Sequence, residues 1–185
     1  MTATRTMLRT AAQQQVSSGV VLARVNDLLY AEIPPGMFVT CFYAILDPKS
    51  GRLHFANAGH EPPYRRCDGS ASELWATGMP LGMMPGTRYE EYEATLAPGE
   101  SLLFYSDGLV EAHNLANEMF SFPRLKTLLE VHSDGVSLIN SVLSELKLYT
   151  GEGWEQEDDV TMVELPRTSL TSRDGKGDHK GTPLP

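Results

Sequence analysis

The segment Glu100-Ser-Leu-Leu-Phe-Tyr-Ser-Asp-Gly108 (residues 100–108) decides how this chain folds. Its centre, Leu102-Leu103-Phe104-Tyr105, is apolar on both faces, which is typical of a central strand. Asp107 follows this strand directly. The reverse arrangement occurs near the end of the chain, where Asp158-Asp159 directly precedes a strand predicted over Val160–Leu165. If the two strands are antiparallel neighbours, Asp107 and Asp158 meet at one edge of the sheet.

Two carboxylates held there by rigid strands suit a hard divalent cation such as Mg²⁺ or Mn²⁺. Gly108 is expected to let the backbone turn sharply away from such a metal ion. The alternative is that Asp107 caps the following helix and that Asp158 is a loop residue in an acidic stretch. Spacing alone leaves both interpretations open. His60, in a loop between strands, is a weaker candidate, because a lone loop histidine is more often a hydrogen-bonding surface residue.

The surrounding sequence predicts an α+β fold with largely antiparallel sheets, because helices come first, then hairpins, then helices and one last strand. Residues 37–46 and 52–58 are expected to form a first hairpin, and residues 91–96 and 100–106 a second one turned by Ala97-Pro98-Gly99. A weaker strand is predicted over Glu73–Thr77. The expected helices cover Thr4 to Gln14, a segment capped by Ser17 or Ser18, a segment after Asp107, a segment starting near Ser121 with Pro123, and a segment capped by Asp134.

The length and composition of the chain are typical of a single globular domain. The chain has 185 residues, of which 41% are hydrophobic and 21% charged, with a net charge of −9. Residues 166–185 are polar and are expected to form a disordered tail, which leaves a domain over residues 1–165 with a net charge of −11. Such an acidic domain is a poor partner for nucleic acid. No apolar run is long enough for a membrane span or a signal peptide, and two cysteines form no metal motif, so we expect a cytoplasmic protein.

Three segments, taken in order, resemble one protein family. They are Asn57-Ala-Gly-His-Glu-Pro-Pro63, then Gly78-Met-Pro-Leu-Gly82 with Leu103-Phe-Tyr-Ser-Asp-Gly-Leu-Val-Glu-Ala112, and finally Asp158-Asp-Val-Thr-Met-Val163. The combination is similar to the metal-dependent protein phosphatase (PPM) family, in the bacterial branch that includes SpoIIE and the stress-response phosphatase RsbU. The resemblance covers about residues 1–165.

This resemblance implies two antiparallel sheets packed as a sandwich and flanked by helices, with a Mn²⁺ or Mg²⁺ centre at one end. It implies hydrolysis of phosphoserine or phosphothreonine on a protein, which in this branch is a small STAS-type anti-sigma-factor antagonist. By position, Asp107 matches the metal-binding aspartate of the Asp-Gly motif, and Asp158 the one that opens the last strand. These two residues are the expected catalytic and metal-binding pair.

One departure from the family pattern concerns the metal ligands. Members of the family carry a Gly-Asp-x-x-Asp-like motif and an Asp-x-x-Gly-x-Gly-like motif on their first strands, and neither is present here. Asp27 and Asp47 are the only early aspartates, and neither has a similar glycine context. The resemblance therefore implies an N-terminally incomplete sandwich with an exposed sheet edge, which a homodimer could cover. The alternative to an active enzyme is an inactive truncated pseudophosphatase that serves at most as a protein-binding module.

Overall fold

A computed structural model describes residues 2–13, 17–133, 136–151 and 158–168. In chain order the elements are α1 (Thr2–Ala12), α2 (Ser18–Glu32), β1 (Cys41–Leu46), β2 (Arg52–Ala58), β3 (Tyr64–Cys67), β4 (Ser70–Glu73), β5 (Tyr92–Thr95), β6 (Ser101–Tyr105), α3 (Asp107–Val110), α4 (Phe122–Val131), α5 (Leu138–Thr150) and β7 (Met162–Pro166). Within this described part, no helix is both long and apolar enough to cross a bilayer.

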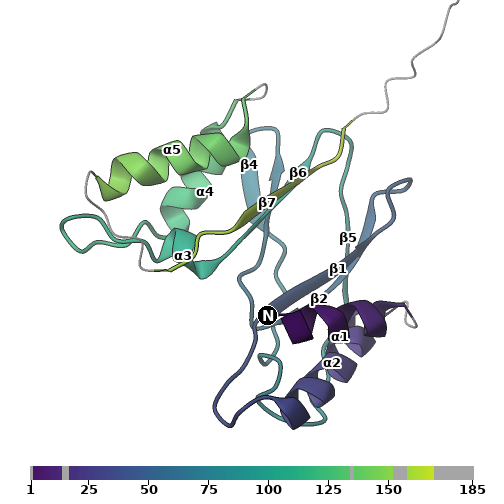
Figure 1. Ribbon diagram of the computed structural model, residues 1–185. Helices are drawn as coiled ribbons and strands as arrows, with labels where there is room; N and C mark the ends of the chain where they lie inside the picture. The colour runs from purple at the N-terminus through teal and green to yellow at the C-terminus, as the bar shows by residue number, and fades with distance from the viewer. Residues whose placement is uncertain (1, 14–16, 134–135, 152–157, 169–185) are drawn as a thin grey trace, which may run out of the picture.

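The strands form two antiparallel sheets between two helical layers (Figure 1). One sheet has the order β1-β2-β5 and carries α1 and α2 on its outer face. The other has the order β4-β3-β6-β7 and packs against α4 and α5. A third apolar cluster, which includes Phe55 of β2 and Leu102 of β6, fills the space between the sheets. The predicted α+β sandwich is confirmed.

Local sequence signals explain several of these elements. Ser17 caps α2 by accepting a hydrogen bond from the Val20 amide, and β1 pairs with β2 as the expected first hairpin. α4 begins after Ser121 with a proline in its first turn. The cap of α5 is Ser137, which accepts from Asn140, whereas the predicted cap, Asp134, lies outside the described residues.

The second predicted hairpin is wrong. β5 pairs with β2, and β6 pairs with β3 and β7, so the turn at residues 97–99 carries the chain from one sheet to the other. The strand predicted over Glu73–Thr77 is also wrong. Residues 74–77 belong to no strand, and Glu73 is the last residue of β4. β4 forms a hairpin with β3, in which Asp68 and Gly69 occupy the turn with positive φ angles.

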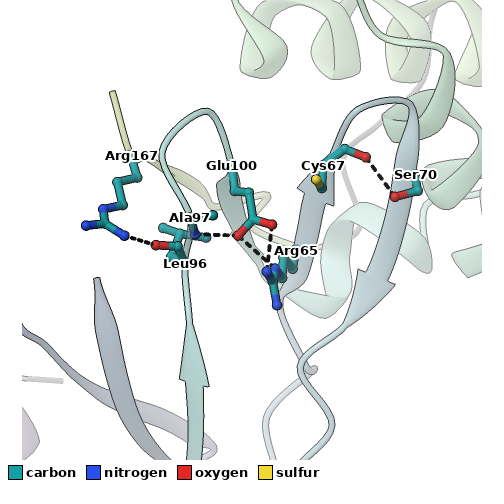
Figure 2. A network of polar contacts seen from close by, with 7 residues as sticks. All are labelled: Arg65, Cys67, Ser70, Leu96, Ala97, Glu100 and Arg167. Carbon is teal, nitrogen blue, oxygen red and sulfur yellow. Dashed lines mark hydrogen bonds and ion pairs between the residues drawn. The ribbon is translucent and has the colours of Figure 1, made fainter. Parts of the chain in front are cut away.

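A polar network secures the start of β6 (Figure 2). The carboxylate of Glu100 accepts hydrogen bonds from Nε and Nη2 of Arg65, at 3.0 and 2.6 Å, and from the Ala97 amide at 2.6 Å. Arg167 bonds the carbonyl groups of Leu96 and Lys49, and its amide donates to the Glu100 carbonyl. Residues 166 and 167 therefore belong to the fold and not to the tail predicted from residue 166, and residues 169–185 lie outside the described residues.

Candidate functional site

The condition for Asp107 and Asp158 to meet, an antiparallel pairing of the strands beside them, holds in the structure. β6 and β7 are neighbours, and their register runs from Ser101 opposite Pro166 to Tyr105 opposite Met162. The pairing continues past the strand ends, where the Ser106 amide donates to the Thr161 carbonyl at 3.0 Å. The segments that lead into Asp107 and out of Asp158 therefore lie side by side at one end of the sheet.

Gly108 allows these two segments to approach closely. A Cβ atom at this position would lie 2.8 Å from the carbonyl oxygen of Asp159 and 3.3 Å from that of Asp158. Its φ angle is not in the left-handed region, since Gly108 lies inside α3. The close approach of the backbone at Asp158 and Asp159, rather than a left-handed φ angle, is therefore what requires glycine at this position.

Both aspartates are exposed, and each accepts a hydrogen bond from the next residue. Asp107 Oδ1 accepts from the Gly108 amide at 2.9 Å, and Asp158 Oδ1 accepts from the Asp159 amide at 2.7 Å. The alternative in which Asp107 caps the following helix is wrong, because the N-cap of α3 is Ser106 and Asp107 is the first helical residue. Ser106 instead ties the two segments together: its hydroxyl donates to the Asp159 carbonyl at 2.8 Å.

The segments 57–63 and 78–82, two of the motifs that carry the family resemblance, pack closely against each other beside this site. Nδ2 of Asn57 donates to the carbonyl groups of His60 and Ala76, and Oδ1 of Asn57 accepts from the His60 amide. Gly59 and Gly78 are required by close packing, since a Cβ atom would lie 2.7 Å from a Pro80 ring carbon and 2.2 Å from the Asn57 carbonyl oxygen, respectively. This interlocking holds the backbone of His60 in place.

His60 faces the same end of the sandwich as Asp107. Nδ1 of its ring lies 3.2 Å from Oγ1 of Thr40, just before β1. Burial lowers the pKa of His60, and the nearby charge of Asp107 partly offsets this effect. The loop histidine is therefore half-buried and lies within the electrostatic reach of Asp107.

Glu61 is a site neighbour that the sequence analysis did not single out. Its pKa is raised by burial and then by the negative charges of Asp107, Glu111 and Glu73. The signal that could have found it is its place next to His60, in a segment held by Asn57. This end of the sandwich is thus strongly acidic, and without a cation it would repel an anionic substrate.

The described residues do not complete the metal centre that the resemblance implies. Among them, no group of three or more His, Cys, Asp or Glu side chains is arranged to hold a metal ion. Asp27 and Asp47, the early aspartates, make local hydrogen bonds instead: Asp27 accepts from the Gly86 amide, and Asp47 from Lys49 and Ser50. Asp107 and Asp158 thus remain the predicted metal-binding pair, and two carboxylates are too few for a two-metal site.

Comparison with known proteins identifies the relatives of this chain. The family model for stage II sporulation protein E (SpoIIE) matches residues 1–168. Protein IcfG of Synechocystis is 32% identical over 132 residues, which are 71% of this chain and 21% of that protein. Phosphoserine phosphatase RsbU of Bacillus subtilis is 30% identical over 152 residues, 80% of this chain and 44% of that protein. The chain thus spans less than half of the length of either curated relative.

Solved structures agree with this assignment. The RsbU and RsbW domains of Rv1364c from Mycobacterium tuberculosis superpose with a TM-score of 0.72 at 28% identity, covering 91% of this chain and 48% of that one. The SiaA-PP2C domain of Pseudomonas aeruginosa gives a TM-score of 0.75 at 21% identity, covering 88% and 66% of the two chains, and supports the fold alone. The chain therefore belongs to the SpoIIE family and has the fold of the PP2C-type phosphatase domains.

Proposed function

We propose that this chain is a metal-dependent protein serine/threonine phosphatase domain that acts on a phosphorylated regulatory protein. The observation that carries the proposal is the pairing of β6 with β7, which puts Asp107 and Asp158 at the same end of one sheet. Membership in the SpoIIE family and 30% identity to a phosphoserine phosphatase support it. The proposed domain extends beyond residue 165 to include Pro166 and Arg167, and the proposed setting is the cytoplasm.

Asp107 and Asp158 are the proposed ligands of Mn²⁺ or Mg²⁺. Carboxylate oxygens are the ligands that these hard cations prefer. The surroundings supply a reason for a cation: the charges of Asp107 and Glu111 are close enough to Glu61 to raise its pKa, after the larger effect of burial, and such a cluster of carboxylates would repel a phosphate group. A bound divalent cation offsets this charge and polarises the phosphoryl oxygens.

The proposed substrate is a phosphoserine or phosphothreonine on a small STAS-type anti-sigma-factor antagonist. The name of the RsbU relative, a phosphoserine phosphatase, supports phosphoserine, whereas phosphothreonine and the STAS-type protein rest on the family resemblance alone. A phosphorylated side chain on a folded protein fits the exposed position of Asp107 and Asp158 better than a small metabolite does, because these carboxylates lie on the surface rather than in an enclosed pocket.

A second candidate is an inactive pseudophosphatase that binds a protein partner without turnover. It is favoured by the ligand count, because the described residues provide no group of three or more metal-binding side chains. Both candidates retain the fold, and they differ in whether any phosphate is released.

Phosphate release from a phosphorylated STAS protein, measured with and without Mn²⁺, tests the proposal. We expect slow, Mn²⁺-dependent release that disappears in Asp107→Asn, because this change removes a charged ligand and keeps the shape of the side chain. Asp68→Asn is the matched control: Asp68 lies in the β3–β4 turn, at the opposite end of the sheet, and its φ of 40° suits asparagine. A folded parent protein that releases no phosphate would establish the pseudophosphatase instead.

A further inference from the structure

Among the described strands, β1 is the one sheet edge without protection against pairing. β4 and β5 have only four residues each, and β5 carries Glu93. β7 has Glu164 at its centre and ends at Pro166. β1 has six residues, none of them charged, and an exposed edge of this kind is a template for another strand.

The free backbone groups of β1 can be assigned from its pairing with β2. The Asp47 amide donates to the Arg52 carbonyl, in the same register that pairs Leu46 with Leu53. Since hydrogen-bonded and non-hydrogen-bonded pairs alternate in an antiparallel ladder, the odd-numbered residues of β1 bond to β2. The amide and carbonyl groups of Phe42, Ala44 and Leu46 therefore point away from the sheet.

Next to this edge, a groove opens into the space between the two sheets. A groove of about 570 Å³ runs between β1 and β7 and is lined by Phe42, Phe104 and Val163 among others. The rings of Phe42 and Phe104 meet edge to face at 5.8 Å, yet both residues are only half-buried, and Val163 is 54% exposed. All six residues of β1 are half-buried, whereas the next strand, β2, is largely buried.

Charge indicates what pairs with β1. The chain carries a net charge of −9, but residues 33–46 contain no charged side chain, so two copies of this segment can meet without like charges facing each other. Arg5 and Arg9 of α1 line a surface pocket together with Val39–Cys41. In an antiparallel pairing centred on Ala44, Cys41 of one copy lies opposite Asp47 of the other, which brings this basic pocket close to an acidic residue.

We propose that β1 pairs with β1 of a second copy of this chain about a two-fold axis at Ala44. Phe42 then lies opposite Leu46 of the other copy, and Ala44 opposite Ala44, with the outward amide and carbonyl groups exchanging hydrogen bonds. The two small sheets become one continuous sheet of order β5-β2-β1-β1-β2-β5. The exposed apolar residues along the groove are covered in the same step, which supplies the driving force for association.

Sedimentation of the full chain at increasing concentration tests this proposal. We expect a species of about twice the 20.4 kDa mass of one chain. Ala44→Pro should abolish it, because proline removes an outward amide from the centre of the interface without removing a bond to β2. Thr95→Pro is the matched control. The Leu96 amide bonds to Gly51, so the Thr95 amide points outward on the opposite edge of the same sheet, and this variant should stay dimeric.

Cross-linking tests the register in the native fold. In a background of Cys41→Ala and Cys67→Ser, which removes both free thiols, Ala44→Cys should form a disulfide-linked dimer under mild oxidation, since the paired Cα atoms lie about 5.5 Å apart. Ala94→Cys serves as the control on β5, because Ala44 and Ala94 pack against the same apolar cluster. The proposal would be overturned if the parent chain stays monomeric at every concentration or if Ala44→Pro still forms a dimer. It would also be overturned if Ala44→Cys and Ala94→Cys cross-link equally.

Discussion

Glu100→Gln provides a quantitative test of how the start of β6 is held, and with it the position of Asp107. The Glu100 side chain is only 7% exposed, and its carboxylate accepts three hydrogen bonds, two from Arg65 and one from the Ala97 amide. Glutamine keeps the size but has a single acceptor oxygen. Its amide nitrogen must therefore face an N–H donor.

The expected loss follows from these contacts. Hydrogen bonds to a charged group contribute about 1.5–3 kcal/mol each, and an unpaired buried charge adds to the cost. Because the Arg65 side chain is 32% exposed, water recovers part of the loss. We expect the free energy of unfolding to fall by about 2–3 kcal/mol, which corresponds to a decrease in Tm of about 4–12 °C for a chain of this size.

Acid should remove the difference between parent and variant. Burial by itself would raise the pKa of Glu100, but the hydrogen bonds from Arg65 and Ala97 hold it below its ordinary value. A carboxyl group with a lowered folded-state pKa stabilises the protein above its unfolded pKa of about 4.3, and this contribution is lost as the pH falls through the folded value. The difference in the free energy of unfolding between the parent and Glu100→Gln should thus have its full value at pH 7 and shrink below about pH 4.

Urea denaturation at pH 7 and at several acidic pH values measures both effects. Glu93→Gln is the control, because Glu93 also pairs with a basic side chain, His54 at 3.3 Å, but is 66% exposed. This variant should change the free energy of unfolding by less than about 0.5 kcal/mol. A loss below about 1 kcal/mol for Glu100→Gln, or a gap independent of pH, would refute the argument.

Three further predictions concern the site and its supports. Gly108→Ala should lower the free energy of unfolding by about 1–2 kcal/mol in urea, because the clash of the added Cβ with the Asp159 carbonyl outweighs the gain in helix propensity; a stabilised variant would contradict this. Asp158→Asn should reduce the heat of Mn²⁺ binding measured by titration calorimetry, and identical titrations of parent and variant would place the cation elsewhere. Glu91→Gln should weaken the start of α2 by about 0.5–1 kcal/mol, because the carboxylate accepts from Ser17, Ser18 and the Gly19 amide; faster amide exchange at Gly19 reports this, and an unchanged rate would argue against it.

The prediction of a second hairpin failed because two strands joined by a short turn look the same in sequence whether they pair with each other or lie in different sheets. Residues 91–96 and 100–106 read as a hairpin because a short turn joins two apolar strands. The amide of Leu96 instead bonds to Gly51 in one sheet, while Glu100 bonds to Arg167 in the other. The β3–β4 hairpin was missed because its strands are polar, although Asp68-Gly69 is a strong two-residue turn signal.

The sequence alone determined the features that depend on near neighbours. These include a cap at Ser17 or Ser18, of which the structure uses Ser17, the hairpin of β1 and β2, the apolar strand before Asp107 and the order of motifs that carries the family resemblance. Side-chain spacing and turn chemistry act over a few residues, so they can be recognised from the sequence without the structure.

Only the tertiary structure decided which strands share a sheet and which side chains lie together at the ends and edges of each sheet. It explained Gly108 by the approach of Asp159, added Glu61 to the surroundings of Asp107, and left β1 as an uncharged edge beside an open apolar groove. These outcomes depend on contacts between residues far apart in the chain. Several pairings satisfy the same local pattern, and the packing of the two sheets selects among them.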